Sequence, residues 1–382
     1  MSCKTITVLG STGSIGKSTL DLLKFHSDKF EVVALTANKN ADLLIEQALQ
    51  FNPKLVAIGD ESLFQQVKSA LSAHGVKVIA GEEGILEAAS MPVDISIAAI
   101  VGMGGLRPLM ASLGNAKTIA IANKEPLVSA GNLFLEAARQ QQTKILPLDS
   151  EHNAIYQVFE NKNRQEISNL ILTASGGPFR EWTAEQISNA TPEQAVAHPN
   201  WSMGAKISVD SASMMNKGLE IIEAYHLFRM PSDKIKVIIH PQSIIHSMVE
   251  YTDGSVLAQL GAPDMRTPIA YALAWPERME TSGSKLDLAK LKTLEFETPD
   301  LIRFPCLQLA YEALESGAAA CIALNASNEI LVEAFLERKI SFSSIPKIIS
   351  SILPTSHTGG FETITDILSY DSEVRKQTRA FL

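Results

Sequence analysis

The sequence is poor in cysteine, has no excess of basic residues and holds no long uninterrupted apolar run. Its cysteines, Cys3, Cys306 and Cys321, are at no zinc-ligand spacing and are too few for a disulfide framework, which favours a reducing cytoplasm. The net charge of −9 argues against a nucleic-acid or membrane-surface partner. We also expect no membrane-spanning helix, and no signal peptide before the predicted strand at 5–9.

The chain is long enough for several domains, and its periodicity changes along its length. The 382 residues suffice for two or three domains, and the apolar content of 46% is ordinary for a globular protein. Over residues 1–149, short β-rich runs alternate with helical patterns, from a strand at 5–9 to a strand at 144–148. This alternation predicts βαβ units and a Rossmann-like, doubly wound parallel sheet.

Beyond residue 149 the pattern is different. Glycine, serine and proline punctuate residues 150–275, where strand-like runs predict an α+β domain. Residues 276–304 lack periodicity and are interpreted as a linker, and residues 305–382 have the pattern of a small α-helical bundle. The predicted class is therefore α/β, with an N-terminal doubly wound sheet, a central α+β domain and C-terminal helices.

A glycine-rich loop follows the first predicted strand and opens a helix. Residues 10–16 are Gly-Ser-Thr-Gly-Ser-Ile-Gly, a GxxGxxG spacing at the first βα junction. Such glycines let the backbone approach a pyrophosphate, and the helix N-terminus offers free N–H donors. A dinucleotide site is the favoured interpretation, and a tight turn without a ligand is the alternative.

The end of the second predicted strand indicates which dinucleotide is bound. An NAD site usually has an acidic residue there for the ribose 2′-hydroxyl. This sequence has Asn38, Lys39 and Asn40 instead, which suit a 2′-phosphate. We therefore favour NADP(H) over NAD(H), while a solvated surface lysine remains the alternative for Lys39.

Two acidic residues follow the last strand of the N-terminal region. Asp149 and Glu151 are two residues apart, and in an extended segment that spacing aims both side chains to one side. Converging carboxylates raise each other's pKa unless a cation lies between them, and oxygen ligands suit Mg²⁺ or Mn²⁺. Unrelated surface acids at a strand end are the alternative.

The segment 198–220 is dense in polar side chains. Ser211, Asn216 and Lys217 can supply two neutral donors and one cation to a phosphate. Glu220 lies four residues after Asn216, on the same face of a predicted helix, and could complete a three-carboxylate metal site. An exposed helical acid is the alternative for Glu220.

Further candidates lie at loop positions. Ser175 follows a predicted strand at 167–173, and its glycine-rich loop could bind an anion or be only a turn. His198 and Trp201 lie in a stretch flanked by proline and glycine, which suits either a mobile lid with an aromatic cover or a packed core tryptophan. Lys124 follows another predicted strand and could bind a substrate oxygen.

These segments together resemble the 1-deoxy-D-xylulose-5-phosphate reductoisomerase family over essentially the whole chain. The matching stretches are GSTGSIG (10–16), ANKE (122–125), LPLDSEHNAI (146–155), SGGPFR (175–180), HPNWSMGAKISVDSASMMNKGLE (198–220), HPQSIIHSMV (240–249), GSVLAQLG (254–261) and PDMRTPIA (263–270). The sequence departs from a well-known member of the family at Asn38, where that member has glycine, and at Pro126, where it has serine. Neither departure falls on a predicted metal ligand or on a predicted contact of the substrate phosphate.

The resemblance implies roles for matching residues. The cofactor pyrophosphate would be held by Thr12, Gly13, Ser14 and Ile15, and the 2′-phosphate end by Lys39 and Asn40, next to the departing Asn38. The nicotinamide half would contact Asn123, Glu125 and Gly204. The metal ligands would be Asp149, Glu151 and Glu220. The substrate would contact Lys124, Ser150, Glu151, Ser175, His198, Trp201, Ser211, Asn216, Lys217, Glu220 and Met265.

The resemblance also implies the reaction. The family rearranges and reduces 1-deoxy-D-xylulose 5-phosphate to 2-C-methyl-D-erythritol 4-phosphate with NADPH and Mg²⁺, Mn²⁺ or Co²⁺, in the non-mevalonate route to isoprenoid precursors. It is cytoplasmic and usually homodimeric, and the β-rich stretch 235–261 is the expected interface. Two alternatives remain: another two-domain NADP-dependent oxidoreductase of the semialdehyde or homoserine dehydrogenase kind, and a non-enzymatic dinucleotide-sensing module.

Overall fold

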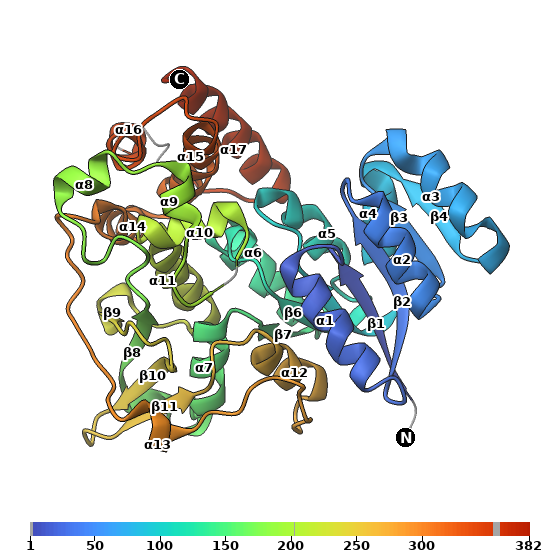
Figure 1. The fold of residues 1–382 in the computed structure, drawn as a ribbon, viewed down its shortest axis with the longest axis horizontal. Helices are drawn as coiled ribbons and strands as arrows, with labels where there is room; N and C mark the ends of the chain where they lie inside the picture. The colour runs from blue at the N-terminus through green and yellow to red at the C-terminus, as the bar shows by residue number, and fades with distance from the viewer. Residues whose placement is uncertain (1–2, 202, 354–359) are drawn as a thin grey trace. The chain divides into compact units, whose positions relative to one another are not determined.

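The protein is described from a computed structural model, which covers residues 3–201, 203–353 and 360–382 (Figure 1). The chain forms two compact units. The first contains the residues up to Asn123, Phe134–Asn153 and Asp264–Ser284, and the second contains Lys124–Leu133, Ala154–Pro263 and Lys285–Leu382. Each unit is therefore assembled from separate stretches of chain.

The first unit is built on a seven-stranded sheet in which all hydrogen-bonded neighbours are parallel. The strand order is β4-β3-β2-β1-β5-β6-β7. The strands are β1 (Lys4–Leu9), β2 (Phe30–Ala37), β3 (Leu55–Ile58), β4 (Lys77–Ala80), β5 (Val93–Ala98), β6 (Ala116–Ile121) and β7 (Lys144–Pro147). Because the order reverses between β1 and β5, a crevice for a ligand is expected at the carboxyl ends of these two strands.

Helices connect these strands, as a parallel sheet requires. They are α1 (Ser14–Phe25), α2 (Ala41–Phe51), α3 (Phe64–Leu71), α4 (Gly81–Ala89), α5 (Leu106–Ala111) and α6 (Glu125–Gln140), whose first turns belong to the second unit. Helix α12 (Arg266–Ala274), from a later stretch of chain, also belongs to the first unit. All four residues of β3 are buried, because helices cover both faces of such a sheet. Lys4 ties α12 to the unit by donating to the carbonyls of Leu273 and Trp275.

The second unit contains a four-stranded mixed sheet in the order β11-β10-β8-β9. The strands are β8 (Ile167–Ala174), β9 (Ile235–Ile239), β10 (Ile245–Tyr251) and β11 (Val256–Leu260). Strand β8 pairs parallel with β9 and antiparallel with β10, and β10 pairs antiparallel with β11. Strand β11 is consequently an edge strand.

Helices of the second unit share one hydrophobic core with this sheet. They are α7 (Ser150–Val158), whose first turn belongs to the first unit, α8 (Ala184–Ser188), α9 (Pro192–Val196), α10 (Ala205–Ala212), α11 (Met215–Phe228), α13 (Leu288–Leu291), α14 (Pro305–Ser316), α15 (Ala318–Leu336), α16 (Ser344–Ile352) and α17 (Ile364–Arg379). The core runs from Leu170 on the sheet through Leu219 on α11 to Ile345 on α16. The C-terminal helices are thus part of the same packed body as the sheet.

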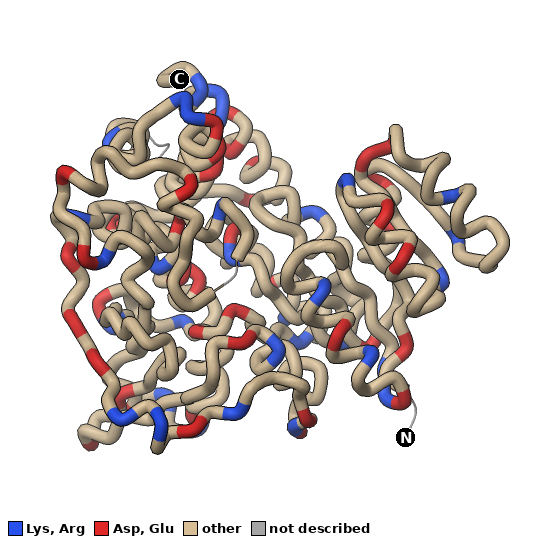
Figure 2. Tube along the Cα trace, in the orientation of Figure 1, with Lys and Arg blue, Asp and Glu red and all other residues tan. Residues whose placement is uncertain are grey.

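Helix α15 is the centre of this helical part. By length and composition it could cross a membrane, but 83% of its apolar 18-residue segment is buried inside the protein. A helix that is apolar all round belongs to a core when other helices cover it, and α14, α16 and α17 contact it. Helix α17 is different, because it is charged: its acidic residues, from Asp366 to Glu373, precede its basic residues, from Arg375 to Arg379 (Figure 2).

The sequence located most elements but missed several short ones. The alternation predicted over residues 1–149 is confirmed by the seven parallel strands from β1 to β7, and the helices predicted over 305–382 are confirmed by α14 to α17. Helices α4 and α5 and strand β10 were not predicted. The predicted domain boundaries, 1–149, 150–275, 276–304 and 305–382, stay a prediction. The two compact units are a different kind of division, because each combines separate stretches of the chain.

Candidate active site

The glycine-rich loop lies between β1 and α1, at the carboxyl end of the strand beside which the strand order reverses. Gly10 has a φ of +84°, and a Cβ there would lie 2.6 Å from the carbonyl oxygen of Ala99. A Cβ on Gly16 would lie 2.4 Å from the carbonyl oxygen of Gly10. Both positions therefore require glycine. Gly13 precedes the helix, no side chain caps α1, and its first N–H groups are available to an anion.

The residues predicted for the 2′-phosphate lie at the end of the neighbouring strand β2. Asn40 caps α2: its side-chain oxygen accepts a hydrogen bond from the Leu43 N–H at 3.2 Å and so stabilises the start of the helix. Asn38 and Lys39 are exposed. The unit therefore presents a cation beside the loop at the position where an NAD-binding protein has an acid.

The acidic pair in the first unit is arranged differently from the prediction. Glu151 lies in the first turn of α7, which begins at Ser150, so the assumption of an extended segment is wrong. Asp149 accepts a hydrogen bond from the Glu151 N–H at 3.2 Å, as a residue preceding a helix commonly does. The Ser150 hydroxyl donates to Glu151 Oε2 at 2.5 Å. Helix capping, rather than strand alternation, therefore brings the two acids together.

The second unit holds a cluster of buried charges. Lys124 and Lys217 are 4% and 3% exposed, and Glu220 between them is fully buried. Glu220 Oε1 lies 3.2 Å from Lys124 Nζ, and Glu220 Oε2 pairs with Lys217 Nζ. Asn216 donates to Glu220 at 2.6 Å and accepts from Lys124 at 2.8 Å.

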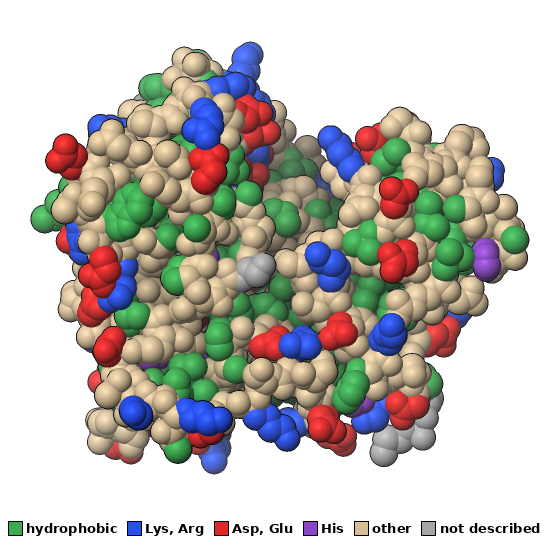
Figure 3. Space-filling view, in the orientation of Figure 1, with side chains coloured by type: hydrophobic (Ala, Val, Ile, Leu, Met, Phe, Trp, Pro, Cys, Tyr) green, Lys and Arg blue, Asp and Glu red, His purple; other side chains and the backbone are tan. Residues whose placement is uncertain are grey.

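Cationic and amide donors gather in this cluster. Lys124, Lys217 and Asn216 lie around the Glu220 carboxylate, and buried charges are stable only with close partners of opposite sign. These lysines differ from the surface cations, which are interspersed with Asp and Glu on the face drawn in Figure 3. The cluster consequently suits an anionic ligand such as a phosphate.

A second set of polar groups surrounds the loop after β8. His198 Nδ1 accepts hydrogen bonds from the N–H groups of Asn200 and Trp201, so the ring proton is on Nε2. That Nε2 donates to Ser175 Oγ at 2.9 Å, and the Gly177 N–H donates to the same oxygen at 3.1 Å. The Ser175 hydroxyl proton is thereby directed to a further acceptor.

Close backbone packing brings this loop to the end of α10. A Cβ on Gly177 would lie 2.6 Å from the carbonyl oxygen of Ser211, and Gly177 has a φ of +68°. Met214, at a φ of +63°, then turns the chain from α10 into α11. Ser175, His198 and Ser211 are therefore brought together, next to the turn that leads to Asn216 and Lys217.

The remaining predicted residues are divided between the units. Asn123 follows β6 and Met265 precedes α12 in the first unit, whereas Trp201 and Gly204 belong to the second. The Trp201 ring lies 6.2 Å from the His246 ring. The predicted metal ligands are likewise divided, with Asp149 and Glu151 in the first unit and Glu220 in the second.

One interaction of the second unit was missed by the sequence analysis. Lys206 on α10 pairs with Glu125 at 2.8 Å and with Asp210 at 2.7 Å. The four-residue spacing of Lys206 and Asp210 on a helix was a usable signal for their contact. The contact with Glu125 joins residues 81 positions apart and is visible only in the folded chain.

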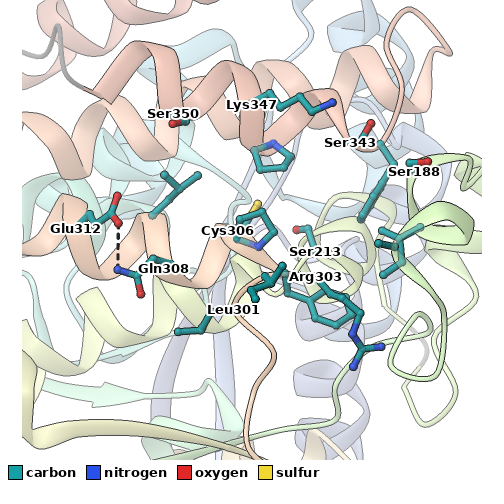
Figure 4. Close-up of a pocket in the computed structure, with 18 residues that line it drawn as sticks. Ser188, Ser213, Leu301, Arg303, Cys306, Gln308, Glu312, Ser343, Lys347 and Ser350 are labelled. Atoms are coloured by element: carbon teal, nitrogen blue, oxygen red, sulfur yellow. Dashed lines mark hydrogen bonds between the residues drawn. The ribbon is translucent and has the colours of Figure 1, made fainter.

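A separate hollow of about 650 Å³ lies elsewhere in the second unit. It is bounded by α14 and α16, with Cys306 and Ser213 in its floor and Lys347 near its rim (Figure 4). Gln308 donates to Glu312 at 3.0 Å along one wall. No predicted site residue is among the described residues that line it.

The fold and the glycine-rich loop define a class: an α/β enzyme of the dinucleotide-binding kind. Family models for 1-deoxy-D-xylulose 5-phosphate reductoisomerase match residues 6–131, and models of its C-terminal domain match 145–228 and 260–377. The chain belongs to the 1-deoxy-D-xylulose 5-phosphate reductoisomerase family. Membership decides against both alternatives that the sequence left open.

Individual relatives extend over almost the full length. A 1-deoxy-D-xylulose 5-phosphate reductoisomerase of Zymomonas mobilis is 52% identical over 379 residues, covering 99% of this chain and 98% of the relative. One of Acidithiobacillus ferrooxidans is 53% identical over 375 residues, covering 97% of this chain and 95% of the relative.

Solved structures give the same result. The Zymomonas mobilis enzyme in complex with NADPH has a TM-score of 0.93 and 49% identity, with 100% of this chain and 99% of that chain covered. A DOX-P reductoisomerase in complex with NADPH, fosmidomycin and magnesium has a TM-score of 0.95 and 45% identity, with 99% and 98% covered.

Proposed function

We propose that this protein converts 1-deoxy-D-xylulose 5-phosphate to 2-C-methyl-D-erythritol 4-phosphate, using NADPH and a divalent metal ion, in the non-mevalonate route to isoprenoid precursors. The observation that carries the proposal is the buried cluster of Lys124, Lys217, Asn216 and Glu220, whose ammonium and amide donors suit a sugar phosphate. Family membership supplies the reaction, and relatives solved with NADPH and magnesium support both cofactors.

The cofactor is proposed to lie along the first unit's loop. The free N–H groups at the start of α1 suit the pyrophosphate, held by Thr12, Gly13, Ser14 and Ile15. Lys39, with Asn38 and Asn40, suits the adenosine 2′-phosphate. Asn123, Glu125 and Gly204 are proposed to contact the nicotinamide half.

The metal site is proposed to consist of Asp149, Glu151 and Glu220. Three carboxylates supply the oxygen donors that Mg²⁺, Mn²⁺ or Co²⁺ accept. A bound cation supplies Lewis-acid charge to neighbouring substrate oxygens. Glu220 pairs with both lysines, so its carboxylate would be shared between them and the cation.

The substrate phosphate is proposed to bind Ser175, Ser211, Asn216 and Lys217. The Ser175 proton is already directed outward by the hydrogen bonds from His198 and Gly177. Because His198 also holds the N–H groups of Asn200 and Trp201, filling the phosphate position orders the segment that carries Trp201. Lys124, Ser150 and Met265 are proposed to complete the substrate contacts.

The test of this function is an absorbance assay of NADPH consumption. Purified protein is mixed with 1-deoxy-D-xylulose 5-phosphate and NADPH, with and without Mg²⁺ or Mn²⁺. Loss of NADPH that requires the metal, and that disappears with EDTA or with NADH, is the expected result. Folded, metal-loaded protein that binds NADPH but turns over no substrate would overturn the substrate assignment.

We also propose a cytoplasmic homodimer. The edge strand β11 exposes Val256, Leu257 and Leu260 at 47%, 41% and 36%, and an uncovered apolar edge strand is a ready pairing surface. Light scattering on a sizing column measures the mass, and Leu257→Lys is expected to shift it from dimer to monomer.

For the compartment, the described cysteines Cys3, Cys306 and Cys321 are all free thiols, which suits a reducing environment.

A further inference from the structure

Within the second unit, a network of polar side chains connects the start of α6 with α10 and the C-terminal helix α15. Glu125 Oε1 accepts from Lys206 Nζ at 2.8 Å, and Lys206 Nζ lies 2.7 Å from Asp210 Oδ2. Asp210 Oδ1 accepts from Asn328 Nδ2 of α15 at 2.8 Å. Glu125, Asp210 and Asn328 are each at most 4% exposed, so solvent screens these contacts little.

Further charges lie on α15 and α17. Glu329 pairs with Arg375 of α17 at 2.7 Å, and Arg375 pairs with Asp371 at 2.6 Å. Burial lowers the pKa of Lys206, but the surrounding Asp210, Glu125 and Glu329 outweigh it and hold the pKa above its ordinary value. Lys206 is therefore a fixed cation among acids contributed by α6, α10 and α15.

One carboxylate oxygen of this network has capacity for a ligand. Glu125 Oε2 is buried and has no hydrogen-bond partner among the described residues. Burial by itself raises the pKa of the Glu125 carboxyl, but Lys206 outweighs this and the pKa lies below its ordinary value. A buried carboxylate oxygen without a donor is unfavourable unless a ligand supplies the N–H.

The nicotinamide ring carries one such donor group, the NH₂ of its carboxamide. Resting on the proposed function, which sets Glu125 beside the nicotinamide half, we propose that Lys206 is a positioning residue for the cofactor: it fixes the Glu125 carboxylate so that Oε2 accepts a hydrogen bond from the carboxamide. Asp210 and Asn328 in turn fix Lys206. The C-terminal helix α15 thereby acts on cofactor recognition without touching the cofactor.

The ion pair between Lys206 and Glu125 also links two parts of the proposed site. Lys206 lies on α10, as does Ser211, which is proposed to bind the substrate phosphate. Glu125 directly follows Lys124, which contacts Asn216 and Glu220. The ion pair thus holds the helix that carries a phosphate donor against the segment that faces the nicotinamide.

The test compares two cofactors by isothermal titration calorimetry, which needs no turnover. One is NADPH, and the other is reduced 3-acetylpyridine adenine dinucleotide phosphate, in which a methyl group replaces the carboxamide NH₂. The wild-type protein is expected to bind NADPH more tightly, by on the order of 10-fold, as one hydrogen bond to a charged group implies. Lys206→Met is expected to lose most of this preference by weakening NADPH alone.

Three further variants separate positioning from general loss of structure. Lys206→Arg keeps the cation and is expected to retain most of the preference. Asn328→Leu is expected to give a smaller loss, of about 2- to 3-fold, because it removes only the support of Asp210. Lys339→Met is the control, since Lys339 is exposed and pairs with Glu337, which is not part of this network.

The outcomes distinguish the inference from the proposed function. Equal weakening of both cofactors by Lys206→Met, or no weakening, would overturn the positioning role. If Lys206→Met does not fold, Glu125→Gln replaces it in the same comparison, and an unchanged preference in that variant overturns the role. Failure of the proposed function would show instead as absent turnover with an intact cofactor preference.

Discussion

The glycine-rich loop of the first unit and the charged cluster of the second are built in opposite ways. The loop is local: residues 10–16 form one turn, and its key requirement is the absence of a Cβ at Gly10 and Gly16. The cluster is assembled from Lys124 and from Lys217 and Glu220, more than 90 residues further along the chain. A local site depends on backbone conformation, whereas an assembled site depends on charge balance in a buried environment.

The assembled site is expected to be the more sensitive to a change of charge. Glu220→Gln removes a proposed metal ligand and leaves Lys124 and Lys217 facing a neutral side chain. Turnover at saturating metal is expected to fall on the order of 10³-fold, because Lewis-acid stabilisation amounts to several kcal/mol. Steady-state kinetics measure this, and calorimetry is expected to show NADPH binding unchanged. The exposed Glu185→Gln is the control, and near-normal turnover of Glu220→Gln would remove Glu220 from the ligand set.

The local site is expected to be the more sensitive to added volume. Gly16→Ala places a Cβ 2.4 Å from the Gly10 carbonyl oxygen and forces the loop to shift. NADPH affinity is expected to fall 10-fold or more, with a loss of about 1–3 kcal/mol in unfolding free energy. Urea unfolding and calorimetry measure the two effects.

Gly13→Ala is the matched control for stability, since a Cβ there meets its nearest neighbour at an ordinary 3.4 Å. Equal destabilisation by the two alanines would show that steric crowding at Gly16 is not what demands glycine.

A third change tests whether the two sites recognise their phosphates separately. Lys39→Gln removes the exposed cation proposed to hold the 2′-phosphate, and NADPH affinity is expected to fall on the order of 10-fold. NADH lacks that phosphate, so its affinity is expected to stay constant. Titration of both cofactors measures this, with Lys29→Gln as a surface control. A parallel loss for NADH would contradict the assignment.

The smallest expected effect concerns pH and lies in the assembled unit. Burial lowers the pKa of His226 to about 4, and its ring contacts Asn132 at 3.2 Å. Since the folded pKa is below the unfolded value of 6.5, this histidine contributes stability that is present above pH 6.5 and is lost as the pH falls towards 4.

His226→Gln is therefore expected to reduce the fall in unfolding free energy over this pH range by about 1–2 kcal/mol. Denaturant unfolding at a series of pH values measures it. Identical pH profiles for the two proteins would show that His226 is not held neutral by the fold.

The sequence by itself determined the features that depend on neighbouring residues. The alternation of strands and helices over 1–149 predicted the parallel sheet, because buried strands and amphipathic helices have different periods. The glycine spacing at 10–16 predicted the loop, since only glycine fits a positive φ and a close backbone approach. The four-residue spacing of Asn216 and Glu220 predicted their contact.

Reasoning from neighbouring residues gave wrong predictions where it assumed the wrong secondary structure. Asp149 and Glu151 were expected to converge through an extended backbone, but α7 begins at Ser150 and a capping hydrogen bond joins them. Short helices such as α5 were missed because six residues give too little periodicity.

Only the tertiary structure decided the rest. Lys124 and Lys217 around Glu220, the proton of His198 directed to Ser175, and the contact of Lys206 with Glu125 all join residues far apart in sequence. Their energetics arise from burial, which weakens solvent screening and makes each charge depend on its partners. Because burial is a property of the packed chain, no local pattern specifies it.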